Sequence, residues 1–148
     1  MRGALAGAPI AVRNPEAVRP WQHVLNPLSG YLRLAEALAG ARELQGGWNF
    51  GPALGDARPV RWIADRPTEL WPDELRWEID SGAHPHEAHF LALDSTKAHE
   101  QLGWAPTWGL EDALARIVGW YLALREGEDM RAVTLAQIAA FDAAGVSA

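Results

Sequence analysis

Residues 110–125 read LEDALARIVGWYLALR, and this stretch carries the clearest structural signal in the chain. Its apolar residues recur at the spacing of one helix face: Leu110, Ala113, Leu114, Ile117, Val118, Tyr121 and Leu124. Glu111 and Asp112 stand in the first turn, where the positive end of the helix dipole favours acidic side chains. We therefore predict a helix over residues 110–125 with a single apolar face.

A second helix is predicted over residues 27–39. Asn26 can cap free backbone amides, and Pro27 suits the first position of a helix, where its missing N–H costs nothing. The apolar residues that follow keep helical spacing: Leu28, Tyr31, Leu32, Ala35 and Leu38. The sequence thus predicts that Asn26 acts as the N-cap of this helix.

Two shorter helices are expected in the middle of the chain. Pro59 can open a helix, but Pro67 falls in its interior, so we expect a kink or an early stop there. Asp94 or Ser95 can cap a short helix that ends at Gly103, because glycine adopts the left-handed conformation that follows many helices.

The remaining elements are a last helix and several short strands. The spacing of Thr134 to Gln137 matches a capping box, which predicts a helix from Thr134 to Gly145. Strands are predicted at residues 9–12, 48–50, 76–79 and 90–93, where short apolar runs lie between turn-forming residues. The sequence therefore indicates a mixed α and β chain without internal repeats.

Composition excludes several classes of function. The chain has 148 residues, 49% of them hydrophobic, which is in the range of one globular domain. Its net charge of −6 argues against nucleic-acid binding, which rests on clustered basic residues. It has no cysteine, no apolar run long enough for a membrane helix and no signal-peptide pattern at its start. We expect a cytoplasmic protein with no nucleic-acid or membrane partner.

Several catalytic motifs are missing from the sequence. No glycine-rich turn has the spacing that a dinucleotide pyrophosphate needs, so no NAD-binding residue can be named. Short-chain dehydrogenases also need a tyrosine four residues before a lysine, but the only lysine, Lys97, follows Leu93 at that distance. Tyr121 and Arg125 have the spacing without the chemistry, because a guanidinium is not a compact ammonium. Gly-x-Ser-x-Gly is absent as well, which leaves a hydrolase unsupported.

A zinc site is an alternative that the histidines leave open. His84, His86 and His89 form a His-x-His pattern with a third histidine nearby, and such residues can converge on zinc. Ala88 stands where metallo-hydrolases with a similar motif carry an aspartate, and no further ligands are evident. We therefore assign no metal ligand and keep a zinc protein as a secondary hypothesis.

Three ordered motifs resemble landmarks of the extended short-chain dehydrogenases that act on nucleotide sugars. They are VRPWQHV at residues 18–24, WNFGP at 48–52 and LGW with Pro106 at 102–106. RPWQHV, together with PHEAH at 85–89 and DMRAVTLAQI at 129–138, resembles the CDP-glucose 4,6-dehydratase branch of this NAD-dependent epimerase/dehydratase family. The likeness covers nearly the whole chain.

The resemblance implies an α/β fold, α+β in this fragment, that corresponds to the C-terminal portion of such an enzyme. Residues 1–56 would be a remnant of the nucleotide-binding Rossmann domain with interdomain segments, and residues 57–148 the small, mainly helical substrate domain. The family oxidises the sugar at C4 with bound NAD, eliminates water across C5 and C6, and returns the hydride to C6. Its NAD-binding and catalytic residues lie upstream of the matched region. We therefore expect no catalytic residue, no NAD held by this chain alone, and no activity in isolation.

The resemblance also names substrate-binding candidates. Arg19 matches an arginine near the sugar-nucleotide diphosphate, a role that suits a guanidinium fork. Glu87 and His86 match a loop near the nucleotide, where a carboxylate can accept ribose hydroxyls and an imidazole can touch phosphate. His84 stands where related enzymes often carry another phosphate-binding arginine. For His23 we favour a buried, hydrogen-bonded histidine at a helix entry over a ligand-binding role.

The expected partners follow from the same resemblance. They are CDP-glucose or a related nucleotide sugar, and either the missing N-terminal half or a second copy of the chain. We expect residues 28–50 to expose apolar surface that needs such a cover. Another nucleotide-sugar epimerase or dehydratase, a stand-alone nucleotide-sugar binding module, and the zinc protein remain as alternatives.

Overall fold

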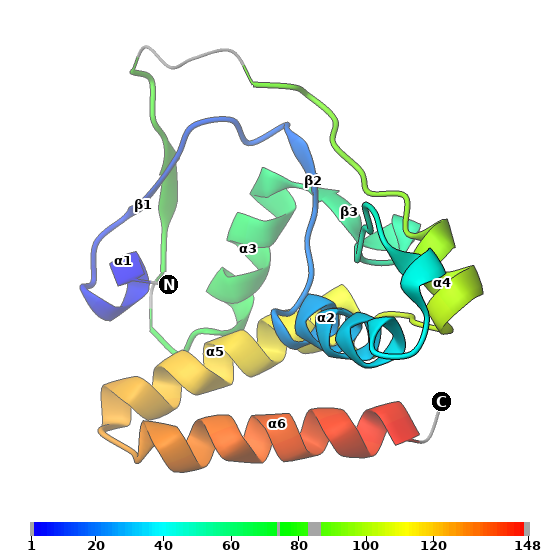
Figure 1. The fold of residues 1–148 in the computed structure, drawn as a ribbon. Helices are drawn as coiled ribbons and strands as arrows, with labels where there is room; N and C mark the ends of the chain where they lie inside the picture. Colours follow the sequence, from blue (N-terminus) through cyan, green and yellow to red (C-terminus); the bar gives the residue numbers. More distant parts are fainter. Residues whose placement is uncertain (1, 74, 83–86, 147–148) are drawn as a thin grey trace.

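The structure is a computed structural model, and it describes residues 2–73, 75–82 and 87–146 (Figure 1). In chain order its elements are α1 (Arg2–Leu5), β1 (Ile10–Val12), β2 (Val18–Pro20), α2 (Leu25–Leu38), the short 3-10 helices η1 (Arg42–Leu44) and η2 (Leu54–Asp56), β3 (Ala57–Pro59), α3 (Val60–Leu70), β4 (Trp77–Ile79), α4 (Thr96–Leu102), α5 (Leu110–Glu126) and α6 (Met130–Val146). The predicted mixture of helices and short strands is confirmed.

The strands form two small sheets. β1 pairs in parallel with β4, with Ile10 opposite Trp77, which confirms the strands predicted at 9–12 and 76–79. β2 pairs with β3 in antiparallel register, with Arg19 opposite Arg58. Each sheet thus joins residues from the first part of the chain to residues that come much later.

The other two predicted strands are wrong. Residues 48–50 form no strand, and at Phe50 and the following Gly51 the backbone bonds to side chains rather than to a neighbouring strand. The amide of Gln22 donates to the carbonyl of Phe50 at 2.7 Å, and the N–H of Gly51 donates to Ser95 Oγ at 2.7 Å. Residues 90–93 make only an isolated bridge between Phe90 and Val18. Short apolar runs therefore overpredicted strands here.

The helices at the end of the chain form an antiparallel pair. α5 and α6 lie side by side (Figure 1), and α5 covers the predicted range 110–125. Four residues of the predicted apolar face are buried in it: Leu110, Ala113, Leu114 and Val118. The short helix α4 is also confirmed, and Gly103 follows it with the left-handed φ of 58° that favours glycine.

The predicted helix starts and stops need three corrections. α2 begins at Leu25, so Asn26 lies inside the helix and is not its N-cap. α3 continues past Pro67 to Leu70, so the predicted early stop is wrong; three residues after the proline complete a last turn. α6 begins at Met130 rather than Thr134 and includes Gly145.

Two apolar clusters make up the core. In the first, Ala4, Trp71, Leu75 and Val118 are buried together, so α1 packs against α5 and the end of α3. In the second, Phe50, Ala98 and Trp104 are buried together, and the rings of Phe50 and Trp104 meet edge to face at 5.0 Å. The second cluster fixes α4 beside α2, on the right of Figure 1.

Candidate functional site

The candidate site is built on β2, which carries Arg19 in its middle. The pairing of β2 with β3 fixes the backbone at this position. Nη1 of Arg19 donates to the carbonyl of Val18 at 2.8 Å, and Nη2 donates to Oε2 of Glu87 at 3.1 Å. The Arg19 side chain keeps 21% of its surface exposed, and the Glu87 side chain keeps 44%. The guanidinium is therefore held in one orientation while it still faces solvent.

Glu87 reaches Arg19 because the segment that follows it runs along β2. The N–H of Val18 donates to the carbonyl of His89 at 2.8 Å, and the N–H of Leu91 donates to the carbonyl of Val18 at 3.1 Å. Two candidate residues that are 68 positions apart thus meet in an ion pair. The other two candidates, His84 and His86, lie outside the described residues.

His23 is a buried, hydrogen-bonded histidine, as predicted. Its side chain is buried, and its Nδ1 accepts the N–H of Leu25 at 3.2 Å, which caps the first turn of α2. Its ring meets the ring of Trp108 edge to face at 4.9 Å. Burial lowers the pKa of His23 below its ordinary value, and the nearby charge of Arg116 lowers this pKa further. The imidazole is therefore held in its neutral form.

Asn26 has a role that the sequence did not reveal. Its side chain is fully buried and bonds to the turn before α5. Its Nδ2 donates to the carbonyl of Trp108 at 2.9 Å, while its Oδ1 accepts the N–H groups of Thr107 at 3.1 Å and Trp108 at 3.2 Å. Asn26 therefore joins α2 to α5. No local pattern could show this contact, because Asn26 and Trp108 are 82 positions apart.

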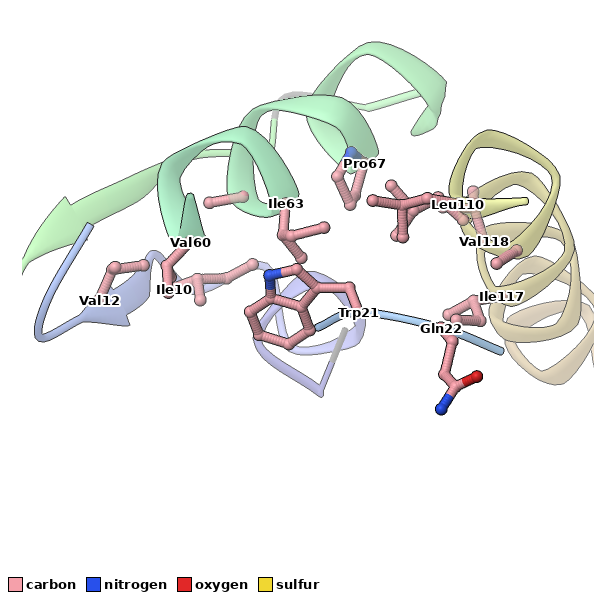
Figure 2. Close-up of a pocket in the computed structure, with 13 residues that line it drawn as sticks. Ile10, Val12, Trp21, Gln22, Val60, Ile63, Pro67, Leu110, Ile117 and Val118 are labelled. Carbon is pink, nitrogen blue, oxygen red and sulfur yellow. The ribbon is translucent and has the colours of Figure 1, made fainter. Parts of the chain in front are cut away.

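An apolar cleft of about 310 Å³ opens beside the candidate site between β1, α3 and α5 (Figure 2). Trp21, two residues after Arg19, lies in this cleft with aliphatic side chains such as Ile63 and Ile117 around it. The amide of Gln22 points away from these side chains in Figure 2. Neither Arg19 nor Glu87 lines this cleft, and its lining offers no charged group to a phosphate. The cleft is therefore suited to apolar contacts and not to an anion.

Metal binding and membrane insertion gain no support from the described part of the chain. No three histidine or acidic side chains converge there as a metal site would require. The zinc hypothesis depends on His84 and His86, so it stays untested. Within the described ranges, no helix combines the length and the apolar character that crossing a bilayer requires.

Sequence comparison relates the chain to the nucleotide-sugar dehydratases. A curated CDP-glucose 4,6-dehydratase of Salmonella typhimurium is 52% identical to it over 123 residues. This match covers 82% of the present chain but only 34% of the relative, so the chain spans about a third of that enzyme's length. No family model matches the chain. The resemblance drawn from the motifs is confirmed: the chain is related to a part of a CDP-glucose 4,6-dehydratase.

Proposed function

We propose that this chain forms the substrate-nucleotide side of a CDP-glucose 4,6-dehydratase and binds the diphosphate of CDP-glucose through Arg19. The observation that carries the proposal is the fixed guanidinium of Arg19, held on β2 and paired with an acidic group at 3.1 Å. A guanidinium in this state already binds one anion and presents a fork that fits phosphate oxygens. In the complete enzyme the product would be CDP-4-keto-6-deoxyglucose.

The chemistry of the reaction would come from outside this chain. The sequence has no glycine-rich loop for NAD and no tyrosine-lysine pair, and the chain spans only about a third of its relative's length. We therefore propose that NAD and the catalytic residues belong to the remaining two thirds of such an enzyme. On this proposal residues 1–56 are a remnant of the nucleotide-binding domain with interdomain segments, and residues 57–148 form the small substrate domain.

An exposed apolar face on α2 supports the proposal that this chain binds a partner. Val24 directly precedes α2, and Leu28 and Leu32 follow it in the helix at intervals of four residues; their exposed fractions are 61%, 43% and 68%. Tyr31 is 56% exposed on the same side of the helix. Large apolar side chains that gather on one exposed helix face mark an interaction surface. We propose that the part of the enzyme with no counterpart in this chain covers it.

The same face continues into an apolar groove beside α5 and α6. His23 and Val24, just before α2, and Leu28 within it line one side of this groove. Trp120 and Ile138 line it from α5 and α6. The partner of α2 would therefore also reach the last two helices. Self-association of the chain is the competing outcome, because a second copy could cover the same apolar surface.

The substrate proposal is tested by calorimetric titration of the chain with CDP-glucose and, separately, with NAD. We expect CDP-glucose to bind and NAD to release no heat. Arg19→Ala should weaken binding of CDP-glucose by about tenfold or more, because charge-assisted hydrogen bonds are among the stronger ones. Arg61→Ala is the matched control, since Arg61 pairs with Glu16 at the surface of α3. Absence of binding to the unaltered chain would refute the proposal.

The partner proposal is tested by sedimentation of the chain alone and with the remaining part of the enzyme supplied as a separate polypeptide. We expect a complex that Leu28→Glu and Leu32→Glu disrupt. Leu54→Glu is the control, because Leu54 is 80% exposed on η2, outside the α2 face. The proposal would be contradicted if the chain remains a monodisperse monomer, melts cooperatively and does not bind the added polypeptide.

A further inference from the structure

The ion pair between Arg19 and Glu87 fills a place that the proposed ligand needs. One edge of the guanidinium is tied to its own strand, because Nη1 donates to the carbonyl of Val18 at 2.8 Å. The other edge, at Nη2, points at Oε2 of Glu87 at 3.1 Å. A phosphate oxygen accepts hydrogen bonds from a guanidinium in the same geometry as a carboxylate oxygen. Glu87 therefore stands where a phosphate oxygen would bind.

We propose that Glu87 is a competing carboxylate that occupies Arg19 in the ligand-free chain and gives way when the diphosphate arrives. This inference rests on the proposed function of Arg19 and assigns Glu87 a role in the same site. Arg19 exchanges one anionic partner for another, so its charge is never left without a counter-charge. In the ligand-free chain the Arg19 guanidinium is then already in its binding orientation.

The energetics of the pair permit this exchange. An ion pair between partly exposed side chains is worth only about 0–1 kcal/mol, because water solvates both groups well. Glu87, which is 44% exposed, can therefore return to solvent at little cost. A carboxylate left beside a diphosphate would be repelled by it, which makes the two anions alternatives on Arg19.

The backbone around the pair keeps the exchange local. The segment after Glu87 is tied to β2 by the bonds of Val18 with His89 and Leu91. These bonds use backbone groups only, so they can persist when the Glu87 carboxylate leaves Arg19. A freed Glu87 would stay near the site, where it could accept the ribose hydroxyls that the sequence resemblance assigns to it.

The test compares binding of CDP and of cytidine to the chain and to Glu87→Gln. The glutamine keeps the size of the side chain but removes the competing charge. We expect Glu87→Gln to bind CDP about two- to fivefold more tightly, as expected for loss of a surface ion pair. Cytidine has no phosphate, so its affinity should not increase. Glu16→Gln is the matched control, because Glu16 pairs with Arg61 elsewhere on the surface and its loss changes the net charge equally.

A second comparison tests whether the gain in CDP affinity depends on Arg19. In an Arg19→Ala background, Glu87→Gln should bring no improvement in CDP binding, because no guanidinium remains to be freed. Unchanged or weaker CDP binding by Glu87→Gln would overturn the inference alone, and so would a gain that persists without Arg19. If neither the unaltered chain nor Glu87→Gln binds CDP, the proposed function fails and the inference fails with it.

Discussion

Replacing Asn26 with aspartate should destabilise the chain, although the two side chains have almost the same shape. The Nδ2 group of Asn26 donates to the carbonyl of Trp108 at 2.9 Å, and an ionised carboxylate has no hydrogen to donate. The substitution leaves this carbonyl without its partner, and Trp108 is buried. An unpaired buried acceptor costs about 1–3 kcal/mol, and a charge beside the carbonyl adds to it. We therefore expect a loss of about 2–3 kcal/mol at neutral pH.

Urea denaturation, followed by the fluorescence of the eight tryptophans, measures this loss. Asn49→Asp is the matched control, because the Asn49 amide also donates to a backbone carbonyl, that of Asp94 at 3.1 Å, but in an exposed position. Burial should raise the pKa of the introduced carboxyl in the folded chain above its ordinary value near 3.9. The difference between Asn26→Asp and the unaltered chain should therefore shrink as the pH falls through this raised pKa toward about 4, because the folded chain gains a proton that the carboxyl can donate. A cost no larger than that of Asn49→Asp would refute the role of Asn26 as a donor between α2 and α5.

Three further outcomes follow from His23 and from two glycines. The pKa of His23 is lowered in the folded chain, so only the unfolded chain gains this proton near pH 6.5. The contribution of neutral His23 to the free energy of unfolding should be fully present above that pH and be lost as the pH falls through the folded pKa. Urea melts at several pH values measure this loss. His23→Gln should make the free energy of unfolding depend less on pH in this range. Gly30→Ala would place a Cβ atom 2.3 Å from Cδ1 of Phe50 and should cost about 1–3 kcal/mol. Gly119→Ala, whose Cβ meets open space in α5, should instead raise the free energy of unfolding by about 0.5–1 kcal/mol.

The sequence predicted elements whose signals are local and repeated. α5 has an apolar face that recurs over four turns and acidic residues in its first turn, and both features act within the helix itself. Gly103 was predictable for the same reason, since a left-handed residue after a helix depends on the backbone of one position. The resemblance to dehydratases likewise rested on contiguous motifs, which the comparison confirmed.

Capping residues were predicted less well because their side chains found distant partners. Thr134 Oγ1 accepts the indole N–H of Trp120 at 3.0 Å and does not open a helix. Gln137 donates to the carbonyl of Arg116 at 3.0 Å, so the apparent capping box joins α6 to α5 instead. Asp129 caps α6 one turn earlier, where its Oδ1 accepts the N–H of Arg131 at 2.9 Å. A polar side chain at a suitable spacing is therefore only a candidate cap until its tertiary contacts are known.

For the candidate site the sequence names single residues and not their arrangement. Arg19 and Glu87 were each assigned to the nucleotide from separate motifs, and nothing in either motif shows that they contact each other. Their meeting depends on the segment around His89 lying against β2, which is a long-range event. The motifs therefore name Arg19 and Glu87 as candidates, while the ion pair between them is visible only in the structure.

The parallel pairing of β1 with β4 sets an order for folding. Ile10 cannot find Trp77 until the intervening chain, which includes α2 and α3, has been synthesised and brought back on itself. Closing so long a loop costs entropy before any contact offsets it, so such pairings form late and slowly. The antiparallel helices α5 and α6 need only a short turn between them and can assemble early. During synthesis β1 would therefore stay without β4 until Trp77 has emerged, and unpaired strand edges of this kind are prone to aggregation.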